Sequence, residues 1–133
     1  MTQEDKELLL QNLCARLPYG IKVNNEIQGD FKIYGICENF VFGRNEVCHI
    51  DFDIEKIKPY LFPLSSMNDE QKKEYNRWKH DVPVCHYEYG DVVEEVELFD
   101  SPESFEYLIE NHFDYHGLIE KGLAIDATGL NIY

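Results

Sequence analysis

Histidine and cysteine are the residue types in this chain that suit metal binding or nucleophilic catalysis. The candidates are His49, Cys85, His86, His112 and His116, with Cys48 next to His49. Structural zinc sites usually take their ligands from CxxC pairs or from histidines about one helical turn apart. His112 and His116 have that spacing, but the helix before them is expected to end near His112, so the shared helix face would be lost. No metal site is therefore predicted.

Catalytic chemistry has equally little support in the sequence. Neighbouring residues on a strand point to opposite faces, so neither Cys48–His49 nor Cys85–His86 can supply both a nucleophile and its base. The chain also lacks a GxSxG elbow and a GxxxxGK phosphate loop. We predict no catalytic residue and no cofactor. A small metal-binding protein or enzyme built on the cysteines and histidines stays open as the alternative function.

Acidic residues dominate the stretch from residue 82 to residue 120. It holds eleven Asp and Glu residues and no Lys or Arg, and Lys121 is the single basic residue between positions 82 and 133. Most of the formal net charge of −14 therefore belongs to the last part of the chain. Such a field attracts basic surfaces and repels polyanions. We predict a basic protein partner, and no direct binding to nucleic acid or to membranes.

Five glutamates are the candidate partner-binding residues: Glu95, Glu97, Glu103, Glu106 and Glu110. They are expected on the outer faces of a hairpin and of the helix that follows it. There they would line one surface, spaced like the phosphates that a basic groove binds. The alternative is that they serve solubility, because any acidic domain keeps glutamates on its outer faces.

Length and cysteine placement bound the class of protein. A chain of 133 residues with 44% hydrophobic residues fits one domain, predicted over residues 1–133, and can bury a core. The four cysteines lie far apart without a CxxC pair, which favours free thiols in a reducing compartment. No apolar run approaches the roughly 20 residues that cross a bilayer, and no signal-like segment begins the chain. We expect a cytoplasmic protein with no membrane segment.

The first half is predicted to form a helix and a curved antiparallel sheet. Thr2 is a good N-cap, and leucines recur at helical spacing until Pro18; Cys14 is expected to be buried with them. Residues 20–52 alternate with a period of two, which predicts three or four strands that curl over the helix and approach a half-open barrel. Phe31, Ile33, Gly35 and Cys37 are expected to share one strand face, and Gly35 suits a β-bulge. Residues 59–64 are expected to form an extended connector over the sheet edge.

The second half is predicted to contain a surface helix over residues 67–80, an acidic hairpin and a further helix. Ser66 is the expected cap of the surface helix, and Gly90–Asp91 is the expected hairpin turn. Ser101 followed by Pro102 predicts the start of a helix over residues 102–112, with Phe105 facing inward. The fold class is therefore α+β: a single domain in which the sheet packs with an N-terminal and a C-terminal helix.

Three blocks of sequence support a family resemblance. They are Leu13–Gly20, then Ile57–Leu61 with Pro63–Met67, and then His112–Tyr115 with Gly117–Ile119 and Lys121–Ala124. Together they resemble a family of short proteins from gut Bacteroides-type bacteria and their phages or mobile elements. The resemblance implies a small cytoplasmic protein linked to phages, and it implies no activity, ligand or site residue. The function predicted from the residues is a non-enzymatic protein-binding module with an acidic C-terminal surface. The sequence predicts no oligomeric state.

Overall fold

The computed structural model describes the backbone of residues 1–88 and 90–133, and their side chains except those of 80–88 and 91–99. These residues form two compact units. One contains residues 1–66 and 109–133, and the other contains residues 67–108; each is described by itself. Helices and a mostly antiparallel sheet form the described part of the chain, so the predicted α+β class is confirmed. The single domain over residues 1–133 stays a prediction.

Helix α1, Gln3–Arg16, begins where the sequence predicts. The hydroxyl of Thr2 caps it by accepting a 3.1 Å hydrogen bond from the backbone N–H of Asp5. Its buried positions, at helical spacing, are Leu9, Asn12, Leu13 and Arg16. Cys14 is exposed, so the expectation of a buried Cys14 was wrong. Two polar side chains occupy part of the buried face, and their spacing turns Cys14 toward solvent.

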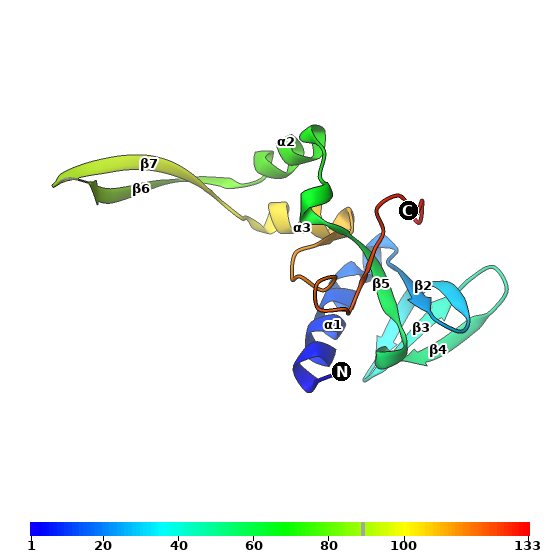
Figure 1. Cartoon of the computed structure of the whole chain (residues 1–133). Helices are drawn as coiled ribbons and strands as arrows, with labels where there is room; N and C mark the ends of the chain where they lie inside the picture. The colour runs from blue at the N-terminus through cyan, green and yellow to red at the C-terminus, as the bar shows by residue number, and fades with distance from the viewer. Residues whose placement is uncertain (89) are drawn as a thin grey trace. The chain divides into compact units, whose positions relative to one another are not determined.

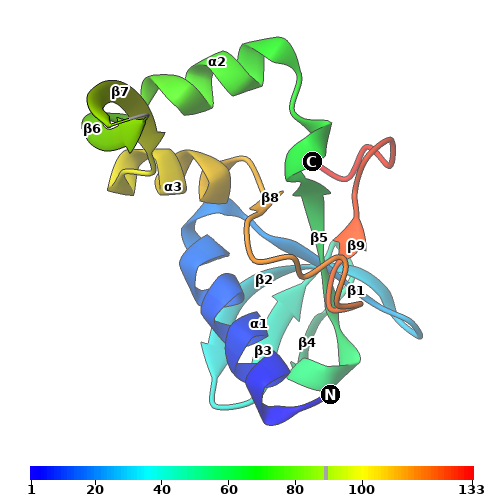
Figure 2. The same cartoon turned by 60° about the vertical axis from the view of Figure 1, so that its left-hand side comes forward.

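The larger unit is built on a sheet that has seven strands among the described residues. They are β1 (Lys22–Asn25), β2 (Gly29–Cys37), β3 (Phe40–Arg44), β4 (His49–Asp53), β5 (Lys58–Pro63), β8 (Phe113–Asp114) and β9 (Ile125–Asp126). Their order is β4-β3-β2-β1-β5-β8, with β9 also paired to β5, which makes an open sheet. Strands β1 to β5 pair antiparallel, whereas β8 and β9 run parallel to β5. Figures 1 and 2 show α1 across one face of the curved sheet.

The core of the larger unit lies between α1 and the sheet. It contains Leu9, Leu13, Ile21, Val23, Phe31, Ile33, Val41, Phe52, Ile54, Ile57, Leu61, Leu118, Leu123 and Ala124. Burying a large aliphatic or aromatic side chain contributes roughly 1.5–3 kcal/mol relative to leaving it exposed. The last three residues of the set follow β8, so the end of the chain closes the core, as the sequence predicts. Short 3-10 helices, η1 (Leu17–Tyr19), η2 (Ile54–Lys56) and η3 (Leu64–Ser66), link the elements.

Two strands show how the backbone departs from simple alternation. The register of β2 against β3 shifts between Ile33 and Gly35, which confirms the predicted bulge. Residues 58–63 are not a connector over the sheet edge, because they form β5, which lies inside the sheet between β1 and β8. Pro59 and Pro63 have no N–H to donate, so the pairing of β5 is short on each side, and the segment resembles a loop in sequence.

The smaller unit contains helix α2 (Asp69–Arg77), the two-stranded sheet of β6 (His80–Glu88) and β7 (Asp91–Phe99), and most of helix α3 (Pro102–Glu110). Asn68, not Ser66, caps α2, in a capping box with Gln71. β6 and β7 pair antiparallel along their length, as Figure 1 shows. The prediction of Gly90–Asp91 as the turn was wrong by one residue, because Asp91 begins β7 and pairs with Glu88. None of the helices in the described ranges has the length and apolar character needed to cross a membrane.

Candidate functional site

Helix α3 carries three of the five predicted binding residues, and a network of serines fixes its start. The hydroxyl of Ser101 accepts a 3.1 Å hydrogen bond from the N–H of Ser104 and donates one to the carbonyl oxygen of Trp78. The hydroxyl of Ser104 in turn accepts a 2.7 Å bond from the N–H of Ser101. Both serines are buried. The predicted Ser101 cap is therefore confirmed, and it anchors α3 to the end of α2.

Glu103, Glu106 and Glu110 are all exposed on α3. Their spacing of three and then four residues puts them on one side of the helix, where seven residues rise by about 10 Å. We refer to these three residues as the acidic helix face. The buried residues of α3 are Ser104 and Leu108. Phe105, which the sequence placed inward, is 43% exposed, because Ser104 takes the inner position beside the cap.

Glu110, the last residue of the acidic helix face, works against the stability of α3. Like charges four residues apart, such as Glu106 and Glu110, destabilise a helix by roughly 0.2–0.5 kcal/mol. Glu110 also lies in the last turn, where the helix dipole favours cations, and α3 has no basic residue there. Among the described side chains, the ion pairs join Lys6 to Glu55 and Arg77 to Glu74, so neither uses Glu103 or Glu110. Stabilisation of α3 therefore does not explain Glu110, whereas Glu103 lies in the first turn, where the dipole favours a carboxylate.

The other two predicted binding residues belong to the hairpin. Glu95 pairs with Val84 and Glu97 with Val82 in the register of β7 against β6. The side chains of Glu95 and Glu97 lie outside the described residues. Their part in the acidic surface therefore stays a prediction, whereas the exposure of the acidic helix face is confirmed.

The histidines of the alternative metal site lie against different aromatic partners. His49 contacts Tyr34, His112 contacts Tyr133, and His116 contacts Tyr115. Helix α3 ends at Glu110, so His112 and His116 do not share a helix face. Over the described side chains, no group of three or more His, Cys, Asp or Glu residues could hold a metal ion. The side chains of Cys85 and His86 lie outside that description.

A buried polar cluster around Arg16 was not predicted. Arg16 is fully buried and donates a 2.5 Å hydrogen bond from Nη2 to the carbonyl oxygen of Phe113. Its guanidinium also lies 5.1 Å from the ring centroid of Tyr115. Nε and Nη1 have no hydrogen-bond partner among the described residues, and burial lowers the pKa of Arg16. One signal of this burial was available in the sequence. Arg16 follows Leu9 by seven residues, about two helical turns, so both side chains lie on the same face of α1.

His112 adjoins this cluster in a left-handed backbone conformation, with φ of +62°. Burial lowers its pKa to about 4, with further contributions from the positive charges of Arg16 and Lys22, so the ring is uncharged at neutral pH. The hydroxyl of Tyr133, which stacks on His112, donates a 2.8 Å bond to the carbonyl oxygen of Tyr60 and accepts a 3.0 Å bond from the N–H of Lys22. The cluster therefore ties the C-terminal segment to β1 and β5.

Comparison with known proteins does not assign a function, so a functional proposal has to rest on the chemistry of the residues described above. No protein-family model, no curated protein and no solved structure matches the chain. The resemblance to short proteins of gut Bacteroides-type bacteria and their phages therefore stays a prediction.

Proposed function

We propose that this chain is a non-enzymatic protein-binding module that presents an acidic surface to a basic partner protein. The surface contains the acidic helix face, together with Glu95 and Glu97 of β7. The observation that carries the proposal is the arrangement on α3, where exposed carboxylates line one side of a helix and the last of them, Glu110, opposes its dipole and repels Glu106. Features that oppose local stability are expected at functional sites, and a complementary basic surface would relieve the repulsion.

Charge supports the same partner. The formal net charge is −14, and eleven acidic residues lie between positions 82 and 120. A field of this sign raises the rate of encounter with basic surfaces, and its reach is about 8 Å at physiological salt. The class of partner that fits best is a nucleic-acid-handling protein, whose basic groove normally binds a row of phosphates. The chain itself does not bind nucleic acid directly in this proposal, because its own charge repels phosphates.

The cysteines favour a cytoplasmic location for this function. Cys14, Cys37 and Cys48 are free thiols and are exposed. Exposed thiols persist unpaired in a reducing compartment, whereas an oxidising one favours disulfides. We therefore place the proposed interaction in the cytoplasm.

The test is a pull-down with the full chain as bait at low and at high salt, followed by binding measurements with the purified captured protein. The site variant carries Glu103→Gln, Glu106→Gln and Glu110→Gln. The matched control carries Glu4→Gln, Glu7→Gln and Glu26→Gln, which change the net charge by the same amount at exposed positions outside α3. We expect wild type and control to capture the same basic protein at low salt and to release it at high salt.

The site variant should bind that protein about tenfold or more weakly than the control, since charge-assisted hydrogen bonds contribute roughly 1.5–3 kcal/mol each. Equal loss in both variants would show that net charge alone attracts the protein, and would contradict a defined site. Metal content is measured on the same purified sample. Zinc near one atom per chain, with no captured protein, would replace the proposal by the alternative built on the histidines and cysteines.

A further inference from the structure

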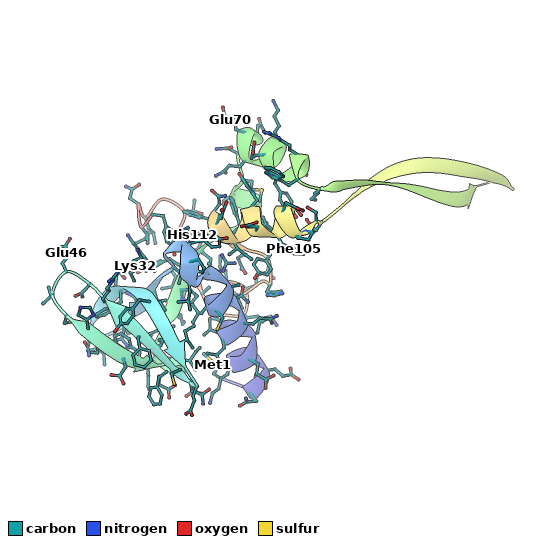
Figure 3. All side chains as sticks on the ribbon, turned by 180° about the vertical axis from the view of Figure 1, so that it is seen from behind. Met1, Lys32, Glu46, Glu70, Phe105 and His112 are labelled. Carbon is teal, nitrogen blue, oxygen red and sulfur yellow. The ribbon has the colours of Figure 1, made fainter. Side chains whose placement is uncertain are left out.

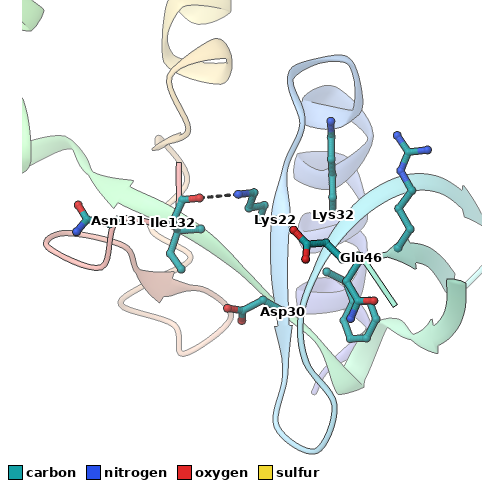
Figure 4. A pocket seen from close by; sticks show the side chains of 9 residues that line it. Lys22, Asp30, Lys32, Glu46, Asn131 and Ile132 are labelled. Atoms are coloured by element: carbon teal, nitrogen blue, oxygen red, sulfur yellow. Dashed lines mark hydrogen bonds between the residues drawn. The ribbon is translucent and has the colours of Figure 1, made fainter. Parts of the chain in front are cut away.

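The larger unit contains a pocket of 530 Å³ beside β1, β2 and β3 (Figure 4). Its charged lining consists of three cations, Lys22, Lys32 and Arg44, and two carboxylates, Asp30 and Glu46. Glu46 lies in the loop between β3 and β4 (Figure 3). Pockets of roughly 300–1,000 Å³ are the usual size for small ligands. The pocket is therefore large enough for a ligand, and its lining carries a small excess of positive charge in a strongly acidic protein.

The three cations form a row across neighbouring strands. Lys22 of β1 pairs directly with Lys32 of β2, and Lys32 pairs directly with Arg44 of β3. Directly paired residues of antiparallel strands lie on the same face, and adjacent strands are about 4.8 Å apart. Like charges that face each other in this way destabilise a sheet. The chain has 12 Lys and Arg residues against 26 Asp and Glu residues, so this row is not a product of a basic composition.

Contacts outside the row hold Lys22 and Arg44 in place. Nζ of Lys22 donates a 2.7 Å hydrogen bond to the carbonyl oxygen of Ile132, the bond drawn in Figure 4. The guanidinium of Arg44 lies 5.9 Å from the ring centroid of Tyr34. Lys32 passes over Gly20, where a Cβ would lie 3.2 Å from Cε of Lys32. The charges of Lys22 and Arg44 are thus positioned before any ligand arrives, which lowers the entropy lost on binding.

The two carboxylates give the pocket a second kind of chemistry. Oδ1 of Asp30 accepts a 2.6 Å hydrogen bond from the hydroxyl of Tyr60 and a 2.9 Å bond from Nδ2 of Asn24, so this carboxylate is fixed beside the row. A carboxylate accepts hydrogen bonds from hydroxyl groups and repels a second acid. The pocket therefore suits a ligand with one anionic end and a hydroxylated body, and it disfavours compounds that are acidic throughout.

We propose that this pocket binds a small phosphate monoester that carries hydroxyl groups, the class of sugar phosphates and nucleoside monophosphates. Lys22, Lys32 and Arg44 hold the phosphate, whose charge relieves the repulsion along the row. Asp30 and Glu46 accept hydrogen bonds from the hydroxyl groups. This site lies in the larger unit and does not rest on the acidic helix face, so each proposal can fail without the other.

The test is calorimetric titration of the full chain at constant ionic strength with four probes: ribose 5-phosphate, adenosine monophosphate, adenosine and citrate. We expect both phosphate monoesters to bind with a Kd below about 1 mM, and adenosine and citrate to bind at least tenfold more weakly. Equal affinity for the two monoesters assigns the site to the sugar phosphate alone. Tighter binding of adenosine monophosphate adds a contact to the base.

Variants of exposed cations locate the binding. Lys32→Gln and Arg44→Gln should each weaken binding of ribose 5-phosphate by about tenfold or more, because each removes a charge-assisted hydrogen bond. Lys121→Gln removes an exposed cation of the same unit away from the pocket and should leave the Kd within about twofold. Circular dichroism confirms that each variant is folded. Absence of binding by both monoesters, citrate binding as tight as the monoesters, or an equal loss in Lys121→Gln would each overturn the proposal.

Discussion

The imidazole ring of His112 lies flat on the phenol ring of Tyr133, with ring centroids 3.7 Å apart and planes inclined by 11°. Nδ1 of His112 has no hydrogen-bond partner among the described residues, although the residue is buried. Burial and two nearby positive charges lower its pKa to about 4, well below the ordinary value of 6.5. The stack therefore accepts an uncharged imidazole and opposes a protonated one.

The stability of the protein should fall as His112 becomes protonated. Because the folded pKa lies below the unfolded one, the unfolded chain binds the proton more tightly. The contribution of the uncharged imidazole to the free energy of unfolding is complete above pH 6.5 and is lost as the pH falls toward 4. A shift of this size corresponds to about 2 kcal/mol once solvent screening at the edge of the stack is allowed for. Urea unfolding at pH 7 and at pH 4 measures the loss.

His112→Asn is the matched variant for that measurement, because Asn tolerates the left-handed conformation at φ of +62° and does not titrate in this range. Carboxylates titrate in both proteins, so the difference between wild type and variant isolates the imidazole. The variant should show the smaller loss of stability between pH 7 and pH 4. Equal losses in the two proteins would show that His112 has the same pKa folded and unfolded.

Arg16 should be replaceable by methionine at a small cost. Arg16→Met loses the hydrogen bond to the carbonyl oxygen of Phe113 but also removes a buried charge that has two unpaired nitrogens. Arg16→Ala leaves a cavity as well, and should lower the free energy of unfolding by about 3 kcal/mol, against about 1 kcal/mol for methionine. Urea unfolding measures both. An NMR titration should also show the pKa of His112 rising in Arg16→Met, since Arg16 contributes to its depression.

Two glutamates at opposite ends of helices should respond in opposite directions to neutralisation. Glu110→Gln removes a negative charge from the last turn of α3 and should stabilise the protein by about 0.3–0.5 kcal/mol. Glu4→Gln removes one from the first turn of α1 and should destabilise it by a similar amount. Thermal unfolding at low salt detects both changes, and high salt should reduce them. A destabilised Glu110→Gln would remove the argument that Glu110 opposes folding.

Lys32→Gln should stabilise the ligand-free protein. Lys32 is the middle of three cations that face one another across β1, β2 and β3, so its neutralisation removes two repulsive pairs. The expected gain is a few tenths of a kcal/mol in the free energy of unfolding, because the side chain is exposed. Lys121→Gln is the control and should leave the thermal midpoint unchanged. A lower thermal midpoint for Lys32→Gln would mean that Lys32 stabilises the fold, and that the row contains no repulsion for a bound anion to relieve.

Local features of the fold were predictable because they depend on neighbouring residues. The Thr2 cap of α1 and the Ser101 cap of α3 follow from a side chain and the backbone within three residues of it. The burial of Arg16 was not predictable in this way, because its partner, Phe113, lies 97 residues away in sequence. The place of β5 inside the sheet depends in the same manner on β8 and β9.

The same distinction between local and long-range contacts applies to the candidate sites. Exposure of the acidic helix face followed from helical spacing around Leu108, so the exposure of these three glutamates could be predicted from the sequence, while their role in binding stays a prediction. The row of Lys22, Lys32 and Arg44 was missed, although counting outward from the turn between β1 and β2 pairs Lys22 with Lys32. Counting outward from the turn between β2 and β3 would pair Arg44 with Ile33, and only the bulge brings Arg44 opposite Lys32. What the sequence lacked was the register, and a bulge on β2 makes any register beyond Ile33 uncertain from pattern alone.

The bulge in β2 shifts by one residue the alternation of side chains between the two faces of the strand. Before it, Phe31 and Ile33 face the core; after it, Ile36 packs against the core, and Cys37 is exposed. The odd-numbered positions thus change from inner to outer within one strand. Cys37 is thereby available as a handle for a fluorescent or spin label, attached to the sheet itself rather than to a loop.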